Sequence, residues 1–133
     1  MSSANHIDIV KKIYEALNQN DIATIFKYFD PDIKRVEFEG TPMAGSFAGY
    51  ADVKVHFETG RSTWAEGSCY PERLVTEGDT VLAFVHVRVR LKDKSDWNEG
   101  RVVDTFTFRN SKVIEMRSFL KSEEALQWVG LKE

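Results

Sequence analysis

The sequence predicts a single α+β domain in which helices come first and a sheet of long antiparallel strands follows. Up to about residue 30, apolar residues recur every three or four positions, as on one face of a helix. From residue 68 onward they alternate with polar residues, as on the two faces of a strand. The chain of 133 residues has the length of one domain and contains no repeat or linker. We therefore expect one domain over residues 1–133.

The first predicted helix covers residues 7–17, with Asn5 as its N-cap. Its apolar residues fall at positions i, i+3, i+4 and i+7, which makes a continuous apolar stripe. A second helix begins after Asp21, which can cap it, and continues to about residue 29. Pro31 stops this helix, because proline disfavours helical geometry in the residue before it. The two helices are expected to form a hairpin with an apolar inner side.

The remaining elements are mostly strands. A short strand is predicted over residues 33–38, followed by a loop that includes Gly45 and by a third helix over residues 49–58. Four longer strands come next, because stretches with alternating apolar and polar residues are separated by short polar turns. They cover residues 68–76, 80–91, 100–109 and 112–120. A helix over residues 122–129, with Ser122 as its N-cap, is expected to close the chain.

The composition excludes several classes of function. The formal net charge is −3 and no cluster of Lys and Arg stands out, so we expect no nucleic-acid partner. The single cysteine, Cys69, excludes an internal disulfide and any metal site with several cysteines, and the three histidines lie far apart, so no metal is expected. The N-terminus lacks the pattern of a secretory signal, and no apolar stretch approaches membrane-spanning length. We therefore expect a cytoplasmic protein without a membrane partner.

Asp104 stands where a strand pattern calls for an apolar residue. In the run from Val102 to Phe108 it shares a face with Val102, Phe106 and Phe108. A charged, unpaired carboxylate on such a face costs roughly several kcal/mol, so Asp104 must be paired, solvated in a cavity, or protonated. Each outcome indicates a pocket. The alternative is a structural acid bonded to a nearby amide or hydroxyl.

The strand from residue 81 to residue 90 has two faces that alternation alone cannot assign. Valines and one alanine make one face, and the other carries Phe84, His86 and Arg88. In one reading the valines lie in the core and the basic residues in solvent. In the other, the Phe84 face lines a pocket and the valine face meets a partner subunit, as both faces of a central strand can be buried.

Five segments, in their order and spacing, carry a family resemblance. They are residues 14–21 (YEALNQND), 29–32 (FDPD), 45–50 (GSFAGY), 104–108 (DTFTF) and 112–114 (KVI). Together they resemble the NTF2-like fold, and within it the SnoaL-like and ketosteroid-isomerase-like branch. The resemblance implies a cone: a curved, mainly antiparallel sheet wrapped around the N-terminal helices, with a pocket inside.

The resemblance also implies roles for two carboxylates. Asp104 falls where this branch keeps a catalytic acid or an oxyanion-hole donor, and Glu37 falls where it keeps the carboxylate that moves a proton. From the residues alone, Glu37 could equally be a solvated side chain on an edge strand. Ile13 stands where steroid isomerases have a second oxyanion donor, a tyrosine. Since neighbouring helical residues point about 100° apart, we do not expect Tyr14 to take that place.

The resemblance directs further side chains into the pocket. His86 becomes a catalytic partner of Asp104, and Arg88 either holds Asp104 ionised or binds a ligand oxygen. The residues expected to contact substrate are Arg88, Phe84, Phe106, Met116, Ser118 and Trp64. With this facing of the strand, the resemblance also implies a homodimer through the convex face of the sheet.

The expected function is that of a small-molecule isomerase or cyclase that needs neither a metal nor an organic cofactor. It would transfer a proton next to a carbonyl group of a small hydrophobic substrate, with Asp104, His86 and Glu37 as catalytic residues. Two alternatives stay open. One is a module that binds a small apolar ligand without turning it over. The other is a dimerisation domain in which Asp104 and Arg88 form a buried ion pair.

Overall fold

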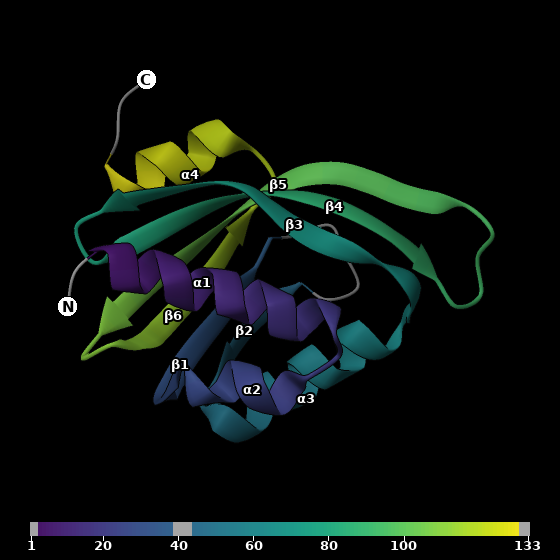
Figure 1. The fold of residues 1–133 in the computed structure, drawn as a ribbon, viewed down its shortest axis with the longest axis horizontal. Helices are drawn as coiled ribbons and strands as arrows, with labels where there is room; N and C mark the ends of the chain where they lie inside the picture. The colour runs from purple at the N-terminus through teal and green to yellow at the C-terminus, as the bar shows by residue number, and fades with distance from the viewer. Residues whose placement is uncertain (1–2, 39–43, 131–133) are drawn as a thin grey trace.

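A computed structural model of the protein describes residues 3–38 and 44–130. The helices are α1 (Ser3–Asn18), α2 (Ile22–Lys27), α3 (Tyr50–Ser62) and α4 (Ser122–Val129). The strands are β1 (Phe29–Glu37), β2 (Gly45–Ala48), β3 (Trp64–Glu77), β4 (Thr80–Leu91), β5 (Trp97–Arg109) and β6 (Lys112–Phe119). Figure 1 shows the strands fanned into one sheet with α1 lying across it.

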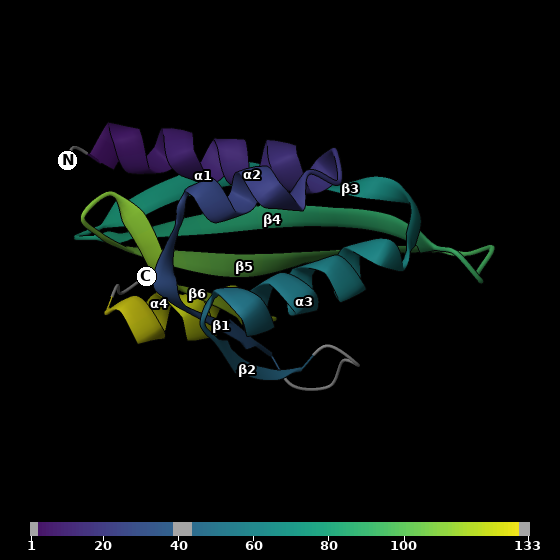
Figure 2. The same cartoon turned by 90° about the horizontal axis from the view of Figure 1, so that it is seen from below.

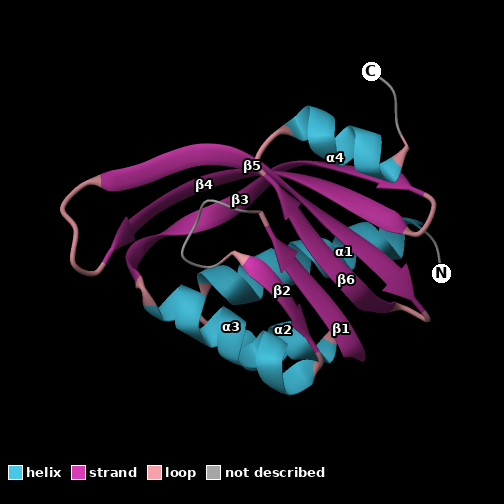
Figure 3. Ribbon diagram, turned by 180° about the vertical axis from the view of Figure 1, so that it is seen from behind, coloured by secondary structure: helices cyan, strands magenta, loops and turns pink. Residues whose placement is uncertain are grey.

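The six strands form a single curved sheet in the order β2-β1-β6-β5-β4-β3. All neighbouring pairs are antiparallel except β1 and β6, which are parallel. Helix α1 packs along β3 and β4, while α3 packs beside β1 and β2 at the other end of the sheet (Figure 2). Helix α4 packs against β4, β5 and β6 (Figure 3). The α+β class and the cone-like arrangement predicted from the sequence are confirmed.

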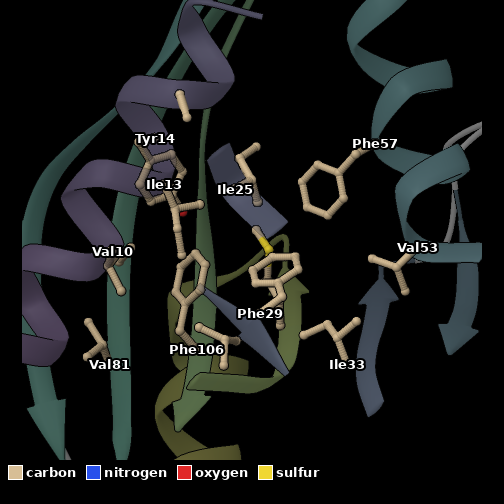
Figure 4. Packing of buried hydrophobic residues seen from close by; sticks show 14 of the residues in the cluster. Val10, Ile13, Tyr14, Ile25, Phe29, Ile33, Val53, Phe57, Val81 and Phe106 are labelled. Atoms are coloured by element: carbon tan, nitrogen blue, oxygen red, sulfur yellow. The ribbon is translucent and has the colours of Figure 1, made fainter. Parts of the chain in front are cut away.

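The main core lies between the N-terminal helices and the concave face of the sheet. Val10, Ile13 and Tyr14 of α1 point toward Phe106 of β5, and Phe57 of α3 approaches from the opposite side (Figure 4). A smaller cluster lies on the convex face of the sheet, between the strands and α4. It consists of Leu82, Val103 and Ala125, with Phe84 and Phe119 packed against them. Because alternate residues of β4 and β5 serve the two clusters, the pleat alone separates the inner face from the outer face.

Several predicted element ends are wrong. Strand β1 begins at Phe29, within the predicted second helix, and contains Pro31. This proline has no N–H to donate, and it lies where the β1–β6 register is irregular, between Phe29 and Lys34. The expected loop at Gly45 contains β2, which pairs with β1. Local patterns do not reveal β2, because its four residues depend on the neighbouring strand for their hydrogen bonds.

The predicted helix caps differ in outcome. Asp21 caps α2 as expected, with its side chain accepting a hydrogen bond from the backbone N–H of Thr24. Asn5 lies inside α1, which begins at Ser3, so its assignment as N-cap is wrong. Ser122 is the first residue of α4, and the N-cap position belongs to Lys121, which makes no side-chain capping bond. Within the described residues, no helix combines the length and apolar character needed to cross a membrane.

The backbones of the paired strands β3 and β4 approach each other closely at Gly67. The backbone there has φ of +128°, and a Cβ atom on Gly67 would overlap the carbonyl oxygen of Arg88. Only glycine meets both requirements without strain. The close approach lets β3 continue back to Trp64, four residues before the predicted strand start at Ser68.

Candidate functional site

A cavity of about 460 Å³ opens between the concave face of the sheet and helices α1 and α3. Much of its wall is apolar, with contributions from Leu17, Phe57, Val85, Val87, Val102 and Met116. Several polar side chains interrupt this apolar wall, and six of them are Tyr14, Arg35, Glu37, His56, Asp104 and Ser118. A mostly apolar cavity with a few convergent polar groups is typical of small-molecule sites.

Asp104 is the best buried carboxylate of the site, and both of its oxygens accept hydrogen bonds. The Tyr14 hydroxyl donates to Oδ2 and the Ser118 hydroxyl donates to Oδ1, each at 2.5 Å. Ser118 reaches Asp104 because the two residues are directly opposite on β6 and β5. Tyr14 reaches it from α1, whose apolar stripe faces the same side of the sheet. Asp104 is thus paired with hydroxyl groups rather than with a cation.

The hydrogen bonds continue from Ser118 to a second carboxylate. The Arg35 guanidinium donates to Ser118 Oγ at 2.8 Å and forms an ion pair with Glu37 Oε1 at 3.0 Å. The other Glu37 oxygen lies 2.9 Å from His56 Nε2. Since Ser118 accepts from Arg35, its only proton is free for Asp104. We call this series, Tyr14–Asp104–Ser118–Arg35–Glu37–His56, the polar chain.

The polar chain is shielded from water along most of its length. The side chains of Arg35 and His56 are 6% and 4% exposed, and that of Glu37 is 19% exposed. Arg35 is held further by the carbonyl oxygens of Val36 and Met116. His56 stacks on Phe47, with ring centroids 4.2 Å apart. These contacts fix the position of each charged group before any ligand arrives.

The two carboxylates have pKa values shifted in opposite directions. Burial raises the pKa of Asp104, and the opposing effects of Arg35, Ser118 and Tyr14 do not cancel it. Burial acts the same way on Glu37, but the His56 hydrogen bond and the Arg35 charge outweigh it, so the pKa of Glu37 lies below its ordinary value. Burial and the neighbouring Asp104 raise the pKa of Tyr14 well above its ordinary value. Around neutral pH Glu37 is therefore ionised and Tyr14 keeps its proton.

The facing of β4 implied by the family resemblance is wrong. Val85 and Val87 line the cavity, whereas Phe84, His86 and Arg88 lie on the outer face. There Phe84 packs against the cluster under α4, and His86 Nε2 lies 2.6 Å from Glu99. The other reading of the alternation, with the valines inward, is correct. Both faces of β4 carry apolar residues, so only the position of α1 over the sheet decides between them.

Arg88 does not contact Asp104. It is exposed, and its guanidinium stacks on Trp97 at 3.8 Å from the ring centroid. The cation that acts on Asp104 is Arg35, on β1. The alternative of a buried Asp104–Arg88 ion pair is therefore wrong. The same facing removes the valine surface as a contact for a partner subunit, because Val85 and Val87 line the cavity and Val81 lies in the core.

Tyr14 contacts Asp104, which contradicts our prediction that Tyr14, one position after Ile13, would point away from the site. Both residues are almost fully buried, at 2% and 1% exposure. Helix α1 lies against the concave face of the curved sheet, and the sheet covers a wide part of the helix surface. The neighbours Ile13 and Tyr14 can therefore both point inward (Figure 4). The hydroxyl of Tyr14 is satisfied by Asp104 while Ile13 packs in the core.

The other candidates divide between cavity and core. Glu37, Trp64, Met116 and Ser118 line the cavity. Phe106 lies behind the wall and packs edge-on against Tyr14, with centroids 5.7 Å apart. Glu37 is therefore not a solvated side chain on an edge strand.

Besides Tyr14, sequence reasoning missed two members of the polar chain, Arg35 and His56. His56 is buried, as is His6, which stacks on Phe108. One signal for Arg35 was available, since residues 35 and 37 share a strand face and carry opposite charges. None existed for His56, because its partner Glu37 comes from another element.

Two further features limit the chemistry of the site. Burial raises the pKa of the Cys69 thiol to about 12, so this cavity residue is not a thiolate around neutral pH. Among residues 3–38 and 44–130, no three His, Cys, Asp or Glu side chains come together as metal ligands.

Comparison with known proteins gives the family. The model of the SnoaL-like domain matches residues 10–116, which is most of the chain. The chain belongs to the SnoaL-like domain family. No curated protein matches this SnoaL-like domain in sequence.

Solved structures support the fold of this SnoaL-like domain. An NTF2-like protein of unknown function from Burkholderia pseudomallei is 18% identical, with a TM-score of 0.80 over 98% of this chain and 99% of that one. An NTF2-like protein from Burkholderia xenovorans is 26% identical, with a TM-score of 0.77 over 96% and 97%. A protein from Jannaschia, provisionally named a SnoaL-like polyketide cyclase, is 12% identical, with a TM-score of 0.78 over 100% and 98%.

Proposed function

We propose that this protein is an enzyme that transfers a proton next to a carbonyl group of a small hydrophobic substrate, in an isomerisation or an aldol-type cyclisation. One observation carries the proposal: a mostly apolar cavity holds two carboxylates, joined by one hydrogen-bonded chain, whose pKa values are shifted apart. Such pairs divide the work of acid and base around neutral pH.

Glu37 acts as the base in this proposal. It is ionised, and Arg35 and His56 hold one oxygen each. A carboxylate has about four lone-pair sites, so these two bonds leave capacity to accept a proton from carbon. His56 acts as a positioning residue, because it fixes the carboxylate without itself needing to contact the substrate.

Tyr14 and Asp104 serve the developing oxyanion. As Glu37 removes the proton from the carbon next to the carbonyl, the electron pair moves to the carbonyl oxygen. In the structure the single Tyr14 hydroxyl proton is donated to Asp104, and both groups lie in the cavity wall. When Asp104 is protonated, its own O–H can donate to the Tyr14 oxygen or to the substrate, and the Tyr14 proton is then free to turn to the carbonyl oxygen. The proton held by Glu37 then returns to a different carbon, or the enolate attacks a second carbonyl. The name given to the Jannaschia relative supports a reaction of the cyclisation type.

Deuterium exchange tests the proposal without knowledge of the natural substrate. The protein is incubated in D₂O with 2-acetonaphthone, an apolar aryl ketone, and deuterium at the methyl group is followed by NMR. Glu37→Gln is expected to lower the exchange rate by about 10²-fold or more, the usual contribution of a general base. Asp104→Asn is expected to lower it as well, while the protein stays folded.

Two outer-face variants are matched controls. Glu72→Gln removes a carboxylate that is paired with Arg101, as Glu37 is paired with Arg35. His86→Gln removes a histidine bonded to a glutamate, and is compared with His56→Gln. Exchange by the wild type that matches the buffer rate, or equal losses in Glu37→Gln and Glu72→Gln, would refute the proposal.

The second candidate function is binding of a small ligand without turnover. It is favoured by the fact that both oxygens of Asp104 are already occupied by hydroxyl donors of the protein itself. A small molecule retained through purification and released unchanged on unfolding, together with exchange at the buffer rate, would support this function.

A homodimer through the convex sheet face is also proposed, with the outer face of β3, β4 and β5 as the contact. This face exposes Tyr70 and Trp97 between residues of both charge signs. A two-fold axis would bring opposite charges together across such a surface. Sedimentation of a monomer at 100 µM protein would refute this dimer.

A further inference from the structure

We infer that the substrate carries an anionic group, such as a carboxylate, that binds Arg61 at the end of the cavity away from Asp104. This inference rests on the proposed function of the cavity and names the class of substrate. It begins from the charges that line the wall.

Arg61 is a cavity-lining cation that has no carboxylate partner among the described residues. Arg35 is paired with Glu37, and Arg101 is paired with Glu72. Arg61 forms no ion pair within residues 3–38 and 44–130. A half-buried guanidinium that lacks a counter-charge favours an anion from outside.

The position of Arg61 is fixed by contacts that leave part of its donor set unused. Its Nε donates to the carbonyl oxygen of Leu17 at 2.8 Å, and its Nη2 donates to that of Asn18 at 3.1 Å. The guanidinium also lies over the ring of Trp64, 4.4 Å from the centroid. A guanidinium has five N–H donors, so the Nη1 edge has no bond to the described residues. Arg61 is thus held in place before a ligand binds.

The register of the sheet places Arg61 some distance from Asp104 along the strands. Arg61 bonds to Asn18, whose side chain brackets the backbone of Cys69. Cys69 is opposite Val87, and Val87 is opposite Gly100. Gly100 lies four residues before Asp104 on the same strand, which is about 13 Å at 3.3 Å per residue.

The wall between the two ends is apolar. Val85, Val87 and Val102 line it from β4 and β5, and Leu17 lines it from α1. A ligand that fits has an elongated apolar body, a carbonyl near Asp104 and an anion near Arg61. The ion pair with Arg61 would select and orient the substrate, and takes no part in the proton transfer.

Two ketones that differ by one charged group test the inference. The first is 2-acetonaphthone, and the second is 6-acetyl-2-naphthoate, which adds a carboxylate at the far end of the rings. We expect the wild type to exchange the naphthoate with a KM at least about tenfold lower. Arg61→Met is expected to remove that difference and change kcat less than twofold. A wild type without preference for the naphthoate, or a loss in kcat instead of KM, would overturn the inference.

Arg101→Met is the matched control. It removes the same charge from an arginine near the same end of the sheet, but one whose side chain is bound to Glu72. The preference for the naphthoate is expected to persist in this variant. An equal loss in Arg61→Met and Arg101→Met would show that only the general field of the protein matters, and would overturn the inference.

A binding measurement separates this inference from the proposed function. Calorimetry compares 2-naphthoate with neutral 2-naphthamide, which requires no turnover. If neither ketone exchanges, the proposed function fails, while tighter binding of the naphthoate that depends on Arg61 would still support the anion site. If Arg61→Met does not fold, Arg61→Lys and the wild type at 50 and 500 mM NaCl replace it. The preference must then shrink with salt, and equal preference at both concentrations would overturn the inference.

Discussion

Tyr14→Phe tests how the two most buried groups of the site share a proton. The change removes only the hydroxyl that donates to Asp104 at 2.5 Å, and it leaves the ring in its edge-on contact with Phe106. Of the hydroxyl donors among the described residues, the carboxyl group then keeps Ser118 alone, in a site shielded from water. The loss of stability must therefore depend on whether Asp104 carries a charge.

The size of the loss follows from the strength of the hydrogen bond. A bond between neutral groups contributes about 1 kcal/mol, and a bond to an ionised group about 1.5–3 kcal/mol. Burial raises the pKa of Asp104, so its carboxyl group is mainly protonated near about pH 4 and ionises as the pH rises. We expect the free energy of unfolding to fall by about 1 kcal/mol near pH 4, and by about 1.5–3 kcal/mol at a pH above the raised pKa of Asp104, where its carboxyl group is ionised.

Urea unfolding at the two pH values, followed by tryptophan fluorescence, measures this difference. Tyr70→Phe is the control, because Tyr70 is 63% exposed and its loss of a hydroxyl should not matter at either pH. An equal loss for Tyr14→Phe at both pH values would refute the reasoning, because the bond would then be insensitive to the charge of Asp104.

Three further predictions concern stability and reactivity. Because the pKa of Asp104 is raised in the folded state, protonated Asp104 stabilises the fold at low pH, and this contribution is lost as the pH rises through the raised pKa. In urea unfolding measured across pH, Asp104→Asn should therefore lose less stability than the wild type as the pH rises. Equal pH dependence in the two proteins would contradict this prediction. Gly67→Ala should lower the free energy of unfolding by about 2 kcal/mol or more in thermal or urea unfolding, because φ is +128° and the new Cβ would overlap the backbone of Arg88. Gly100→Ala is the control: its Cβ would meet no atom within 4 Å, so the free energy of unfolding should change by no more than about 0.5 kcal/mol. Burial raises the pKa of Cys69 to about 12, so at about pH 7 its thiol should react with iodoacetamide far more slowly in the folded protein than in urea. Mass spectrometry measures the two rates, and equal rates would contradict the burial of the thiol.

Much of the fold could be predicted from periodicity. The long strands β4 and β6 and helix α3 lie where alternation and helical spacing place them. Errors concentrate at ends and in the short strand β2, where hydrogen bonds to a neighbouring strand outweigh local preference. Pro31 shows this clearly: it predicted the end of a helix, yet it lies inside a strand at an irregular part of the register.

The site was harder to predict, because its members come from five elements. Asp104 was identified since a carboxylate on an apolar strand face requires a physical explanation. Its hydroxyl partners were not, since Tyr14 lies 90 residues away in the chain. His86 and Arg88 were chosen for their chemistry, but β4 turns them outward.

The sequence by itself determined the class of the fold, the buried position of Asp104 and the need for a polar environment around it. These follow from the spacing of apolar residues and from the cost of burying a charge, both of which are local properties. Only the tertiary structure decided which groups satisfy Asp104 and which face of β4 lines the cavity. The curvature of the sheet and the position of α1 on it determine those contacts. Both depend on packing between elements, which local sequence patterns do not predict.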